Sequence, residues 1–253
     1  MSGATVRGDW FLGSLLAVEP AADRETWTID SVLVAPVGDR LGFTATDRAR
    51  LHYVTIPARW EGSPPPPFVM SREDITEVRG WAGRKGLAGL DVLIRPDDVV
   101  VGLRFVAAAA VDVDPGPLTV GDTDLARNFP AVGRLLRSHL VDPTGPGEAS
   151  VELDPRLLAD AIAAAERVRR LDRDGSRGGG QRSVRVIARG DRRPLSVSWD
   201  PGTTDRETPR FVGLVMPRRG GPGMGSRALA DARGIPDPDP AADADTDDQA
   251  AAS

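Results

Sequence analysis

The sequence predicts an α+β fold, built from repeated modules in which a helix is combined with antiparallel strands. Three observations lead to this prediction. Short β-branched runs are separated by turn-forming pairs such as Gly38-Asp39. Three longer segments have the apolar spacing and start signals of amphipathic helices. The order of short strand, helix and two or three further strands recurs along the chain, which indicates an internal structural repeat.

Each of the three helices has a recognisable beginning. The first is expected over Asp9–Glu19, where the apolar residues fall on one face. The second is expected to begin at Ser71, which forms a capping box with Asp74. The third is expected to begin at Asp154 as its N-cap, with Pro155 at the first helical position.

The strands are predicted from β-branched and aromatic runs that are bounded by turn residues. We expect them near Trp27–Ala35, Leu41–Thr46, Leu51–Ile56, Val92–Ile94, Val99–Phe105, Ala108–Val113, Val184–Ala188, Leu195–Trp199 and Phe211–Met216. Turns rich in Gly, Pro and Asp lie between several of them, as antiparallel hairpins require.

Composition divides the chain into three parts. The segment VDPTGPGE, residues 141–148, reads as a boundary between a domain over residues 1–137 and a smaller one over residues 149–219. Residues 220–253 lack apolar periodicity and are rich in Gly, Pro, Ala and Asp, so we expect a disordered acidic tail there.

Charge and cysteine content narrow the function classes. Two arginines and seven aspartates in residues 221–253 account for the whole net charge of −5, so the remainder of the chain is close to neutral. With a net charge near zero, the chain before residue 221 lacks the overall positive potential that drives nonspecific nucleic-acid binding. The chain has no cysteine and no apolar run of the roughly 20 residues that a membrane span needs, so we expect a cytoplasmic protein without disulfides.

No residue pattern indicates catalysis. His52 and His139 lack the serine and carboxylate partners of a catalytic triad, and a packed or exposed imidazole is the simpler interpretation of both. No His, Asp and Glu residues have metal-ligand spacing, and Gly178–Gly180 lacks the Gly-Lys-Ser/Thr of a phosphate-binding loop. We therefore predict a protein that is not an enzyme and that needs no metal or cofactor.

Three segments carry a more specific signal. They are Thr46–Leu51 (TDRARL), Asn128–Leu135 (NFPAVGRL) and Phe211–Arg219 (FVGLVMPRR). In this order they resemble the segments that build the partner-binding cleft of the bacterial DNA polymerase III beta subunit, the sliding clamp. The resemblance implies a sliding-clamp fold of about one and a half clamp domains. Residues 1–137 would correspond to the central domain, and residues 149–219 to half of the C-terminal domain.

In that family a hydrophobic cleft captures short peptides of polymerases and repair proteins. Carried over by position, the resemblance assigns to the cleft Ile29, Thr46, Asp47, Arg50, Leu51, Pro130, Arg134, Leu135, Leu157, Ser196, Leu214, Val215, Met216, Pro217 and Arg219. Extended peptides need such an apolar floor with a few polar groups to fix their direction. The first segment differs from the family's pattern at two positions, because Arg48 replaces the family's glycine and Ala49 replaces its histidine.

The family's helices line a channel for double-stranded DNA. The basic residues of the second and third helices would occupy that position, namely Arg72, Arg79, Arg84, Lys85, Arg156, Arg167 and Arg170. A solvated helix face is the alternative explanation of the same residues.

Two hypotheses of function follow. The first is a sliding-clamp-like processivity or accessory factor that binds peptide motifs of replication and repair partners, with DNA as a further partner. The alternative is a structural or regulatory protein that kept the clamp fold, forms an oligomer with itself or with a full-length clamp, and lost both DNA encirclement and peptide binding.

Overall fold

The computed structural model describes residues 3–23, 26, 29–85, 90–97, 100–107, 118–130, 132, 136, 153–171, 184–187, 194–199 and 208–217. For residues 83–85, 96–97, 100–102 and 104–107 it describes the backbone only. Met1–Pro217 forms one compact unit. Among the described residues, no helix has the length and apolar character needed to cross a membrane.

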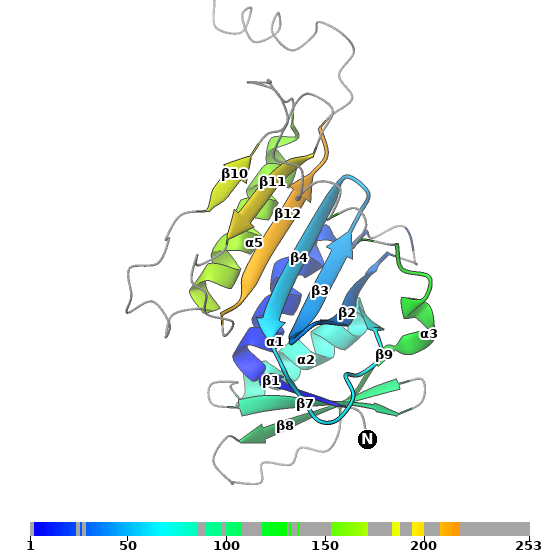
Figure 1. The fold of residues 1–253 in the computed structure, drawn as a ribbon. Coiled ribbons are helices and arrows are strands. Elements are labelled where there is room, and N and C mark those ends of the chain that lie inside the picture. Colours follow the sequence, from blue (N-terminus) through cyan, green and yellow to red (C-terminus); the bar gives the residue numbers. More distant parts are fainter. Residues whose placement is uncertain are drawn as a thin grey trace, which may run out of the picture. The chain divides into compact units, whose positions relative to one another are not determined.

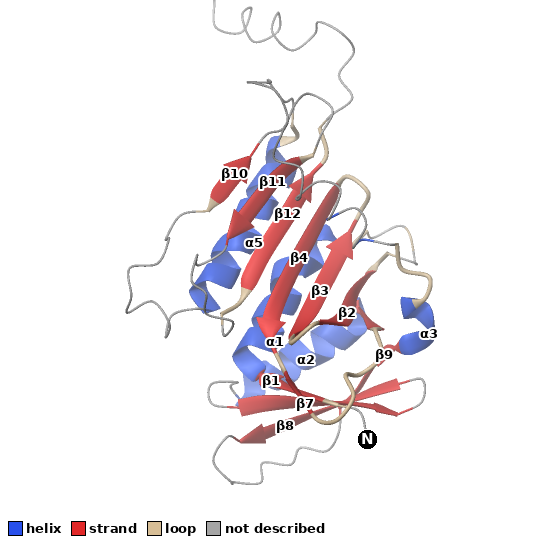
Figure 2. Ribbon diagram, viewed as in Figure 1, coloured by secondary structure: helices blue, strands red, loops and turns tan. Residues whose placement is uncertain are grey.

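Figure 2 shows how strands and helices are arranged. In the described part of the chain, twelve strands are joined in one antiparallel sheet. They are β1 (Ala4–Arg7), β2 (Ser31–Val37), β3 (Arg40–Thr46), β4 (Arg50–Pro57), β5 (Arg59–Trp60), β6 (Phe68–Ser71), β7 (Leu90–Asp97), β8 (Val100–Ala107), β9 (Leu118–Asp122), β10 (Arg185–Ile187), β11 (Leu195–Trp199) and β12 (Arg210–Val215). The helical elements are α1 (Gly8–Val18), the short 3-10 turn η1 (Glu19–Ala21), α2 (Arg72–Lys85), α3 (Thr123–Ala126) and α5 (Pro155–Leu171).

The strand order reveals an internal repeat. It runs β10-β11-β12-β4-β3-β2-β6-β9-β8-β7-β1-β5. One module consists of β1, α1 and β2 to β4, and the next consists of β6, α2 and β7 to β9. Each module gives its first strand to the other, since β1 pairs with β7 and β6 pairs with β2. The third module begins at α5 and contributes β10 to β12.

The third module continues the sheet of the first. Strand β12 pairs with β4 over six residues, from Arg210 opposite Thr55 to Val215 opposite Arg50. Helices α1 and α5 lie side by side behind these strands (Figure 1). The indole nitrogen of Trp10 on α1 donates to the carbonyl of Leu171 at the end of α5, at 3.1 Å. A Cβ on Gly13 would come within 2.5 Å of the Leu171 side chain, so glycine permits this close approach of the helices.

Apolar side chains gather on both faces of the sheet. The main core lies on the helix-covered face and contains Phe11 of α1 and Phe43 of β3, whose rings meet edge to face at 5.5 Å. A second, smaller group lies apart from it. This group, called the outer cluster below, consists of Leu51, Val69, Phe129, Val132, Leu136 and Leu214.

The second and third predicted helices begin where expected, and the first begins one residue earlier, at Gly8. Ser71 N donates to Asp74 Oδ2 at 2.8 Å, and Asp74 N donates to Ser71 Oγ at 3.1 Å, which is the predicted capping box. The carboxylate of Asp154 accepts from the backbone N–H of Arg156 at 2.9 Å, as an N-cap does.

Most strand predictions that fall on described residues agree with the structure within three residues, but one begins too early and four strands were missed. The first predicted strand begins too early, because the described residues before Ser31 form hydrogen-bonded turns, with Ile29 N donating to Thr26 O. The predicted strand Ala108–Val113 lies outside the described residues. Four strands were not predicted, because their short lengths give little periodicity to detect, namely β1, β5, β6 and β9.

Candidate functional site

Two of the three sequence segments contribute side chains to one row on the sheet. In the register of the sheet Thr46 lies opposite Leu51, Leu51 opposite Leu214, and Leu214 opposite Ser196. Directly opposed residues of antiparallel strands project to the same face, so these four side chains share one face of β3, β4, β12 and β11. Leu51 and Leu214 are only 2% and 1% exposed and form the centre of the row.

A parallel row lies beside it. Val69, Leu33, Thr44, Tyr53 and Val212 are opposed in sequence across β6, β2, β3, β4 and β12. The two rows define the outer face, which is the face of the sheet turned away from the main core. This second row was not predicted. The spacing of two residues between Leu51 and Tyr53 on β4 places both on one face of a strand, and this pattern was visible in the sequence.

The segment after α3 covers the centre of the outer face. Phe129, Val132 and Leu136 pack on Leu51 and Leu214, and each is less than a tenth exposed. Pro130, a predicted cleft residue, is exposed beside them. The segment is positioned by α3, because Phe129 N donates to Ala126 O at 3.3 Å.

The Asp122 carboxylate holds the start of α3. It accepts from the N–H of Asp124 at 2.7 Å and from that of Leu125 at 3.0 Å. The next residue inward, Gly121, has φ of +81°, and a Cβ there would lie 2.7 Å from Phe68 and 3.0 Å from the carbonyl of Val69. Glycine is therefore required at the point where the chain turns from β9 into the covering segment.

The Thr46–Leu51 segment owes its sequence to a tight turn. Thr46 Oγ1 donates to the carbonyl of Arg50 at 2.8 Å and accepts from Arg48 N at 3.2 Å. Asp47 Oδ1 accepts from the N–H groups of Ala49 and Arg50 at 3.0 and 2.8 Å. Thr46 and Asp47 thus act on the backbone of the turn, in the manner of Asx and Ser/Thr turns.

Arg48 occupies a left-handed backbone position. Its φ is +71°, and it is the one described residue other than glycine with a positive φ. The resemblance places the family's glycine here, and this backbone conformation supplies a physical reason for glycine. The arginine therefore carries conformational strain at the tip of the β3–β4 hairpin.

Arg50 links the turn to the third module. Its Nε contacts Asp47 Oδ2 at 2.9 Å, and its Nη1 contacts the carboxylate of Asp160 on α5. Two carboxylates thus engage this guanidinium, whose side chain is 14% exposed. Arg50 is placed to hold β4 against α5. Its partner Asp160 lies 110 residues away in the chain and could not be predicted from local patterns.

Met216 stands at the accessible end of the outer face. Its N–H donates to the carbonyl of Ala49 at 2.8 Å, which ties the end of β12 to the β3–β4 turn. The side chain is 38% exposed, whereas Leu214 two residues earlier is buried. A flexible thioether next to an apolar row is suited to contacts with varied partners. Pro217 is half-buried after it.

The remaining predicted cleft residues lie elsewhere. Val215 and Leu157 contribute to the main core, on the opposite face from Leu214. Ile29 is buried in the turn before β2 and belongs to neither apolar cluster. Arg134, Leu135 and Arg219 lie outside the described residues.

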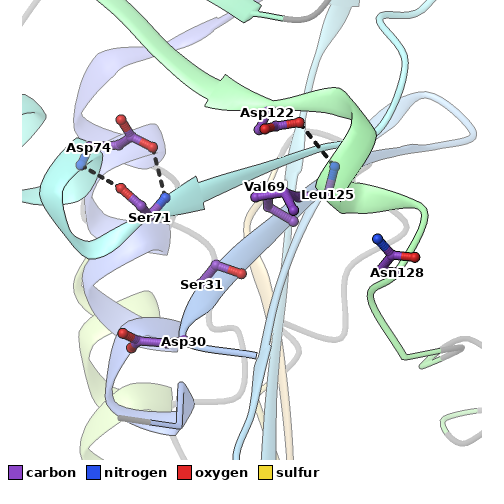
Figure 3. Close-up of a pocket in the computed structure, with 8 residues that line it drawn as sticks. All are labelled: Asp30, Ser31, Val69, Ser71, Asp74, Asp122, Leu125 and Asn128. Atoms are coloured by element: carbon purple, nitrogen blue, oxygen red, sulfur yellow. Dashed lines mark hydrogen bonds between the residues drawn. The ribbon is translucent and has the colours of Figure 1, made fainter. Parts of the chain in front are cut away.

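A small acidic pocket of about 100 Å³ borders Val69 (Figure 3). Asp30, Asp74 and Asp122 line it, but each carboxylate has a structural partner. Asp74 and Asp122 cap α2 and α3, and Asp30 contacts Arg72. In the described part of the chain no group of three or more His, Cys, Asp or Glu side chains could hold a metal ion.

Several of the predicted DNA-facing arginines are already paired. Arg72 contacts Asp30 and, at 3.8 Å, Glu19, and Arg79 contacts Glu19 at 2.6 Å. Arg167 donates to the carbonyl of Leu16. Arg156 and Arg170 are exposed, and the side chains of Arg84 and Lys85 are not described. The acidic residues beside α2 therefore offset part of its positive charge.

His52 lies within the main core, as the interpretation of a packed imidazole requires. Its Nδ1 is 3.2 Å from the carbonyl of Ala17 and donates to it, and Nε2 has no hydrogen-bond partner among the described residues. Burial lowers its pKa to about 4, with a further lowering by Arg50, against raising effects of the Ala17 carbonyl and Asp160. The ring contacts Phe211 of β12 edge to face, with ring centroids 5.6 Å apart.

Comparison with known proteins gives a match at the level of structure. No family model matches the chain, and no curated protein matches its sequence. The beta subunit of DNA polymerase III from Thermotoga maritima is similar over 87% of this chain and 66% of its own, with 14% identity and a TM-score of 0.61. The Pseudomonas aeruginosa beta subunit and the Bartonella birtlesii sliding clamp are 13% and 12% identical, each over 90% of this chain and 68% of theirs, with TM-scores of 0.56.

The chain therefore has the sliding-clamp fold. The predicted fold class is confirmed, with helices on one face of antiparallel sheets and a recurring module. The chain spans about two thirds of the length of the clamp subunits that it resembles.

Proposed function

We propose that this protein is a clamp-like, non-enzymatic accessory factor of DNA replication or repair, which binds short peptide segments of partner proteins on the outer face. The observation that supports this most is the Leu51–Leu214 pair, which joins the first module to the third module at one apolar row. The three segments that resemble the clamp's peptide cleft all contribute to this region.

The accessible part of the row indicates where a peptide would begin to bind. Phe129, Val132 and Leu136 cover Leu51 and Leu214, whereas Met216 is exposed and Val212 and Tyr53 are half-buried. We assign the first apolar anchor of the peptide to Met216 and its second to the Tyr53–Val212 pair. A peptide with two apolar side chains separated by one or two residues matches an extended backbone along this face.

Arg50 has a different role in this proposal from the one that the resemblance implied. Its guanidinium is engaged by Asp47 and Asp160, so it supports the cleft rather than holding the peptide backbone. Double-stranded DNA is a second proposed partner, with less support than the peptide. Asp30 and Glu19 already pair with Arg72 and Arg79 of α2, which reduces the positive charge that this helix could offer to phosphates.

Fluorescence anisotropy with a labelled peptide of the type Gln-Leu-x-Leu-Phe tests the proposal. We expect saturable micromolar binding by the wild type, and at least about tenfold weaker binding by Met216→Asp, because a charge would be placed against the apolar anchor. The matched control is Ile162→Asp, an exposed apolar residue of α5 on the helix-covered side of the sheet, at 37% exposure against 38% for Met216. The absence of binding by the wild type, or equal binding by Met216→Asp, would contradict the proposed site.

A variant at the centre of the row is a less direct probe. Leu51→Ala removes buried apolar volume, and comparable core truncations cost about 2 to 5 kcal/mol of folding stability. Loss of binding by this variant is informative only when circular dichroism shows that it remains folded at the assay temperature.

A further inference from the structure

Arg48 carries the one charge of the β3–β4 turn that has no partner among the described residues. The other two charged side chains of the turn pair with each other, since Arg50 contacts Asp47 at 2.9 Å, and Arg50 also contacts Asp160 of α5. The Arg48 side chain is exposed, and no described residue forms a hydrogen bond or an ion pair with it. Its guanidinium therefore offers a full positive charge and its N–H donors to solvent.

The backbone of Arg48 is held in a conformation that favours glycine. Its φ of +71° lies in the left-handed region, where a side chain lowers stability relative to glycine. The Arg48 N–H donates to Thr46 Oγ1 at 3.2 Å, and Asp47 Oδ1 accepts from the N–H groups of the two residues after Arg48, so the turn fixes this conformation. Strained residues of this kind cluster at ligand-binding sites, where the surrounding structure maintains them. The strain and the unpaired charge are two independent observations on one residue.

The turn places Arg48 next to the accessible end of the outer face. The N–H of Met216 donates to the carbonyl of Ala49 at 2.8 Å, so Met216 is bonded to the residue that directly follows Arg48. Met216 is 38% exposed and is the proposed first apolar anchor of the peptide. The proposed second anchor, the Tyr53–Val212 pair, lies on the other side of Met216, since β4 leads away from the turn. Arg48 thus lies just beyond the first anchor, at the end of the path that the peptide would follow.

We propose that Arg48 selects peptides in which an acidic side chain immediately precedes the first apolar anchor. This inference rests on the proposed function, because it concerns the same peptide on the same face. A carboxylate next to the Arg48 guanidinium gains charge-assisted hydrogen bonds, which are stronger than those that an uncharged side chain would make there. A basic residue at the same place in the peptide is repelled, so the free charge of Arg48 both favours acidic partners and rejects basic ones.

The selection acts at contact distance. The two positive charges of Arg48 and Arg50 are balanced by the two negative charges of Asp47 and Asp160, so the group attracts an acidic peptide little at long range. An exposed ion pair contributes modestly to binding, which corresponds to a preference of about twofold to fivefold in affinity. Arg48 is therefore a determinant of specificity, and the apolar anchors supply most of the affinity.

Two labelled peptides that differ at one residue test the proposal by fluorescence anisotropy. They are Gln-Leu-x-Leu-Phe and Glu-Leu-x-Leu-Phe, whose first side chains have nearly the same shape and differ in charge. We expect the wild type to bind the glutamate peptide about twofold to fivefold more tightly. Arg48→Gly should bring the ratio of the two dissociation constants to about one, and Arg48→Glu should invert it, whereas Arg48→Lys should keep the preference. Glycine is favoured at this backbone position, so misfolding would not explain a loss of preference in Arg48→Gly.

Two controls separate the effect of Arg48 from a general effect of charge. Arg59→Glu reverses the charge of an exposed arginine just past the opposite end of β4, and it should leave the ratio unchanged. A second pair of peptides, with glutamine or glutamate added after the phenylalanine, carries the same charge difference at its other end. Arg48→Gly should not alter the ratio for this second pair.

The outcomes distinguish this inference from the proposed function. If the wild type binds the glutamine peptide but has no preference for glutamate, or if Arg48→Gly keeps the preference, the role of Arg48 is overturned and the proposed function stands. If neither peptide binds, the proposed function is contradicted and this inference falls with it. If Arg48→Gly weakens binding of a short DNA duplex and leaves the peptide ratio unchanged, Arg48 contacts phosphate instead, and the proposal is again overturned.

Discussion

The guanidinium of Arg50 on β4 lies between two carboxylates, that of Asp47 in its own hairpin and that of Asp160 on α5. This arrangement joins the β3–β4 turn to the helix of the third module, next to the strand pairing of β4 with β12. One side chain thus connects the local turn with the junction between modules, and it lies next in sequence to the buried Leu51 of the outer face.

Removing Asp47 should cost more stability than removing Asp160. Asp160 is 47% exposed, and exposed ion pairs contribute about 0 to 1 kcal/mol, so Asp160→Asn should lower the free energy of unfolding by no more than that. Asp47→Ala leaves two backbone N–H groups of the turn without their acceptor as well, and we expect a loss of about 1 to 2 kcal/mol. Urea denaturation of the two variants measures both. Equal losses would show that the backbone bonds of Asp47 contribute little.

The left-handed position of Arg48 predicts opposite effects of two substitutions. Arg48→Gly removes the steric cost of φ near +71°, and we expect stability to stay unchanged or to rise by up to about 1 kcal/mol. Arg48→Val places a β-branched side chain in the same conformation and should lower stability by about 1 to 2 kcal/mol. The difference between the two midpoints of thermal unfolding checks this, and a valine variant as stable as the glycine variant would be incompatible with the turn described.

Gly121 should tolerate no side chain. A Cβ would meet Phe68 and the Val69 carbonyl at 3.0 Å or less, and the φ of +81° adds backbone strain, so Gly121→Ala should cost about 2 kcal/mol or more. Because β9 leads into α3 and the segment that covers Leu51 and Leu214, the variant should also speed amide exchange in that segment. Gly38→Ala is the comparison, since its φ is +61° but no atom lies within 4 Å of the added Cβ. Equal destabilisation by both would assign the effect to backbone strain alone.

His52 should make stability depend on pH in a defined window. Its pKa is about 4 in the folded protein and near 6.5 when unfolded, so the unfolded state binds the proton first as the pH falls. The neutral imidazole's contribution is fully present above pH 6.5 and is lost as the pH falls towards 4, by about 3 kcal/mol in total. Comparing wild type with His52→Leu between pH 7.5 and pH 4 isolates this term. A difference in unfolding free energy that does not change with pH would contradict the burial of His52.

Local signals made much of the fold predictable. The capping box of Ser71 and Asp74 and the N-cap Asp154 act within one turn of chain, so their residues identify the helix starts directly. The short strands β1 and β6 were not predictable, because they are held by pairing with β7 and β2 from the other module rather than by their own sequence.

The candidate site was predictable only in part, for a similar reason. Leu51, Leu214 and Met216 were found through their segments, but their register across β4 and β12 depends on long-range pairing. The resemblance assigned both Val215 and Leu214 to the cleft. Adjacent residues of a strand point to opposite faces, and Val215 lies in the main core. The cover of Phe129, Val132 and Leu136, and the partner Asp160 of Arg50, required three-dimensional contacts to be seen.

Hydrogen–deuterium exchange with and without the Gln-Leu-x-Leu-Phe peptide is the decisive test of peptide binding on the outer face, because it locates the bound peptide on the intact chain. We expect slower exchange in residues 49–53 and 208–217 at saturating peptide, with residues 72–82 of α2 unchanged. Exchange that slows only outside those two segments, or that does not change in them, would contradict the assignment of peptide binding to the outer face.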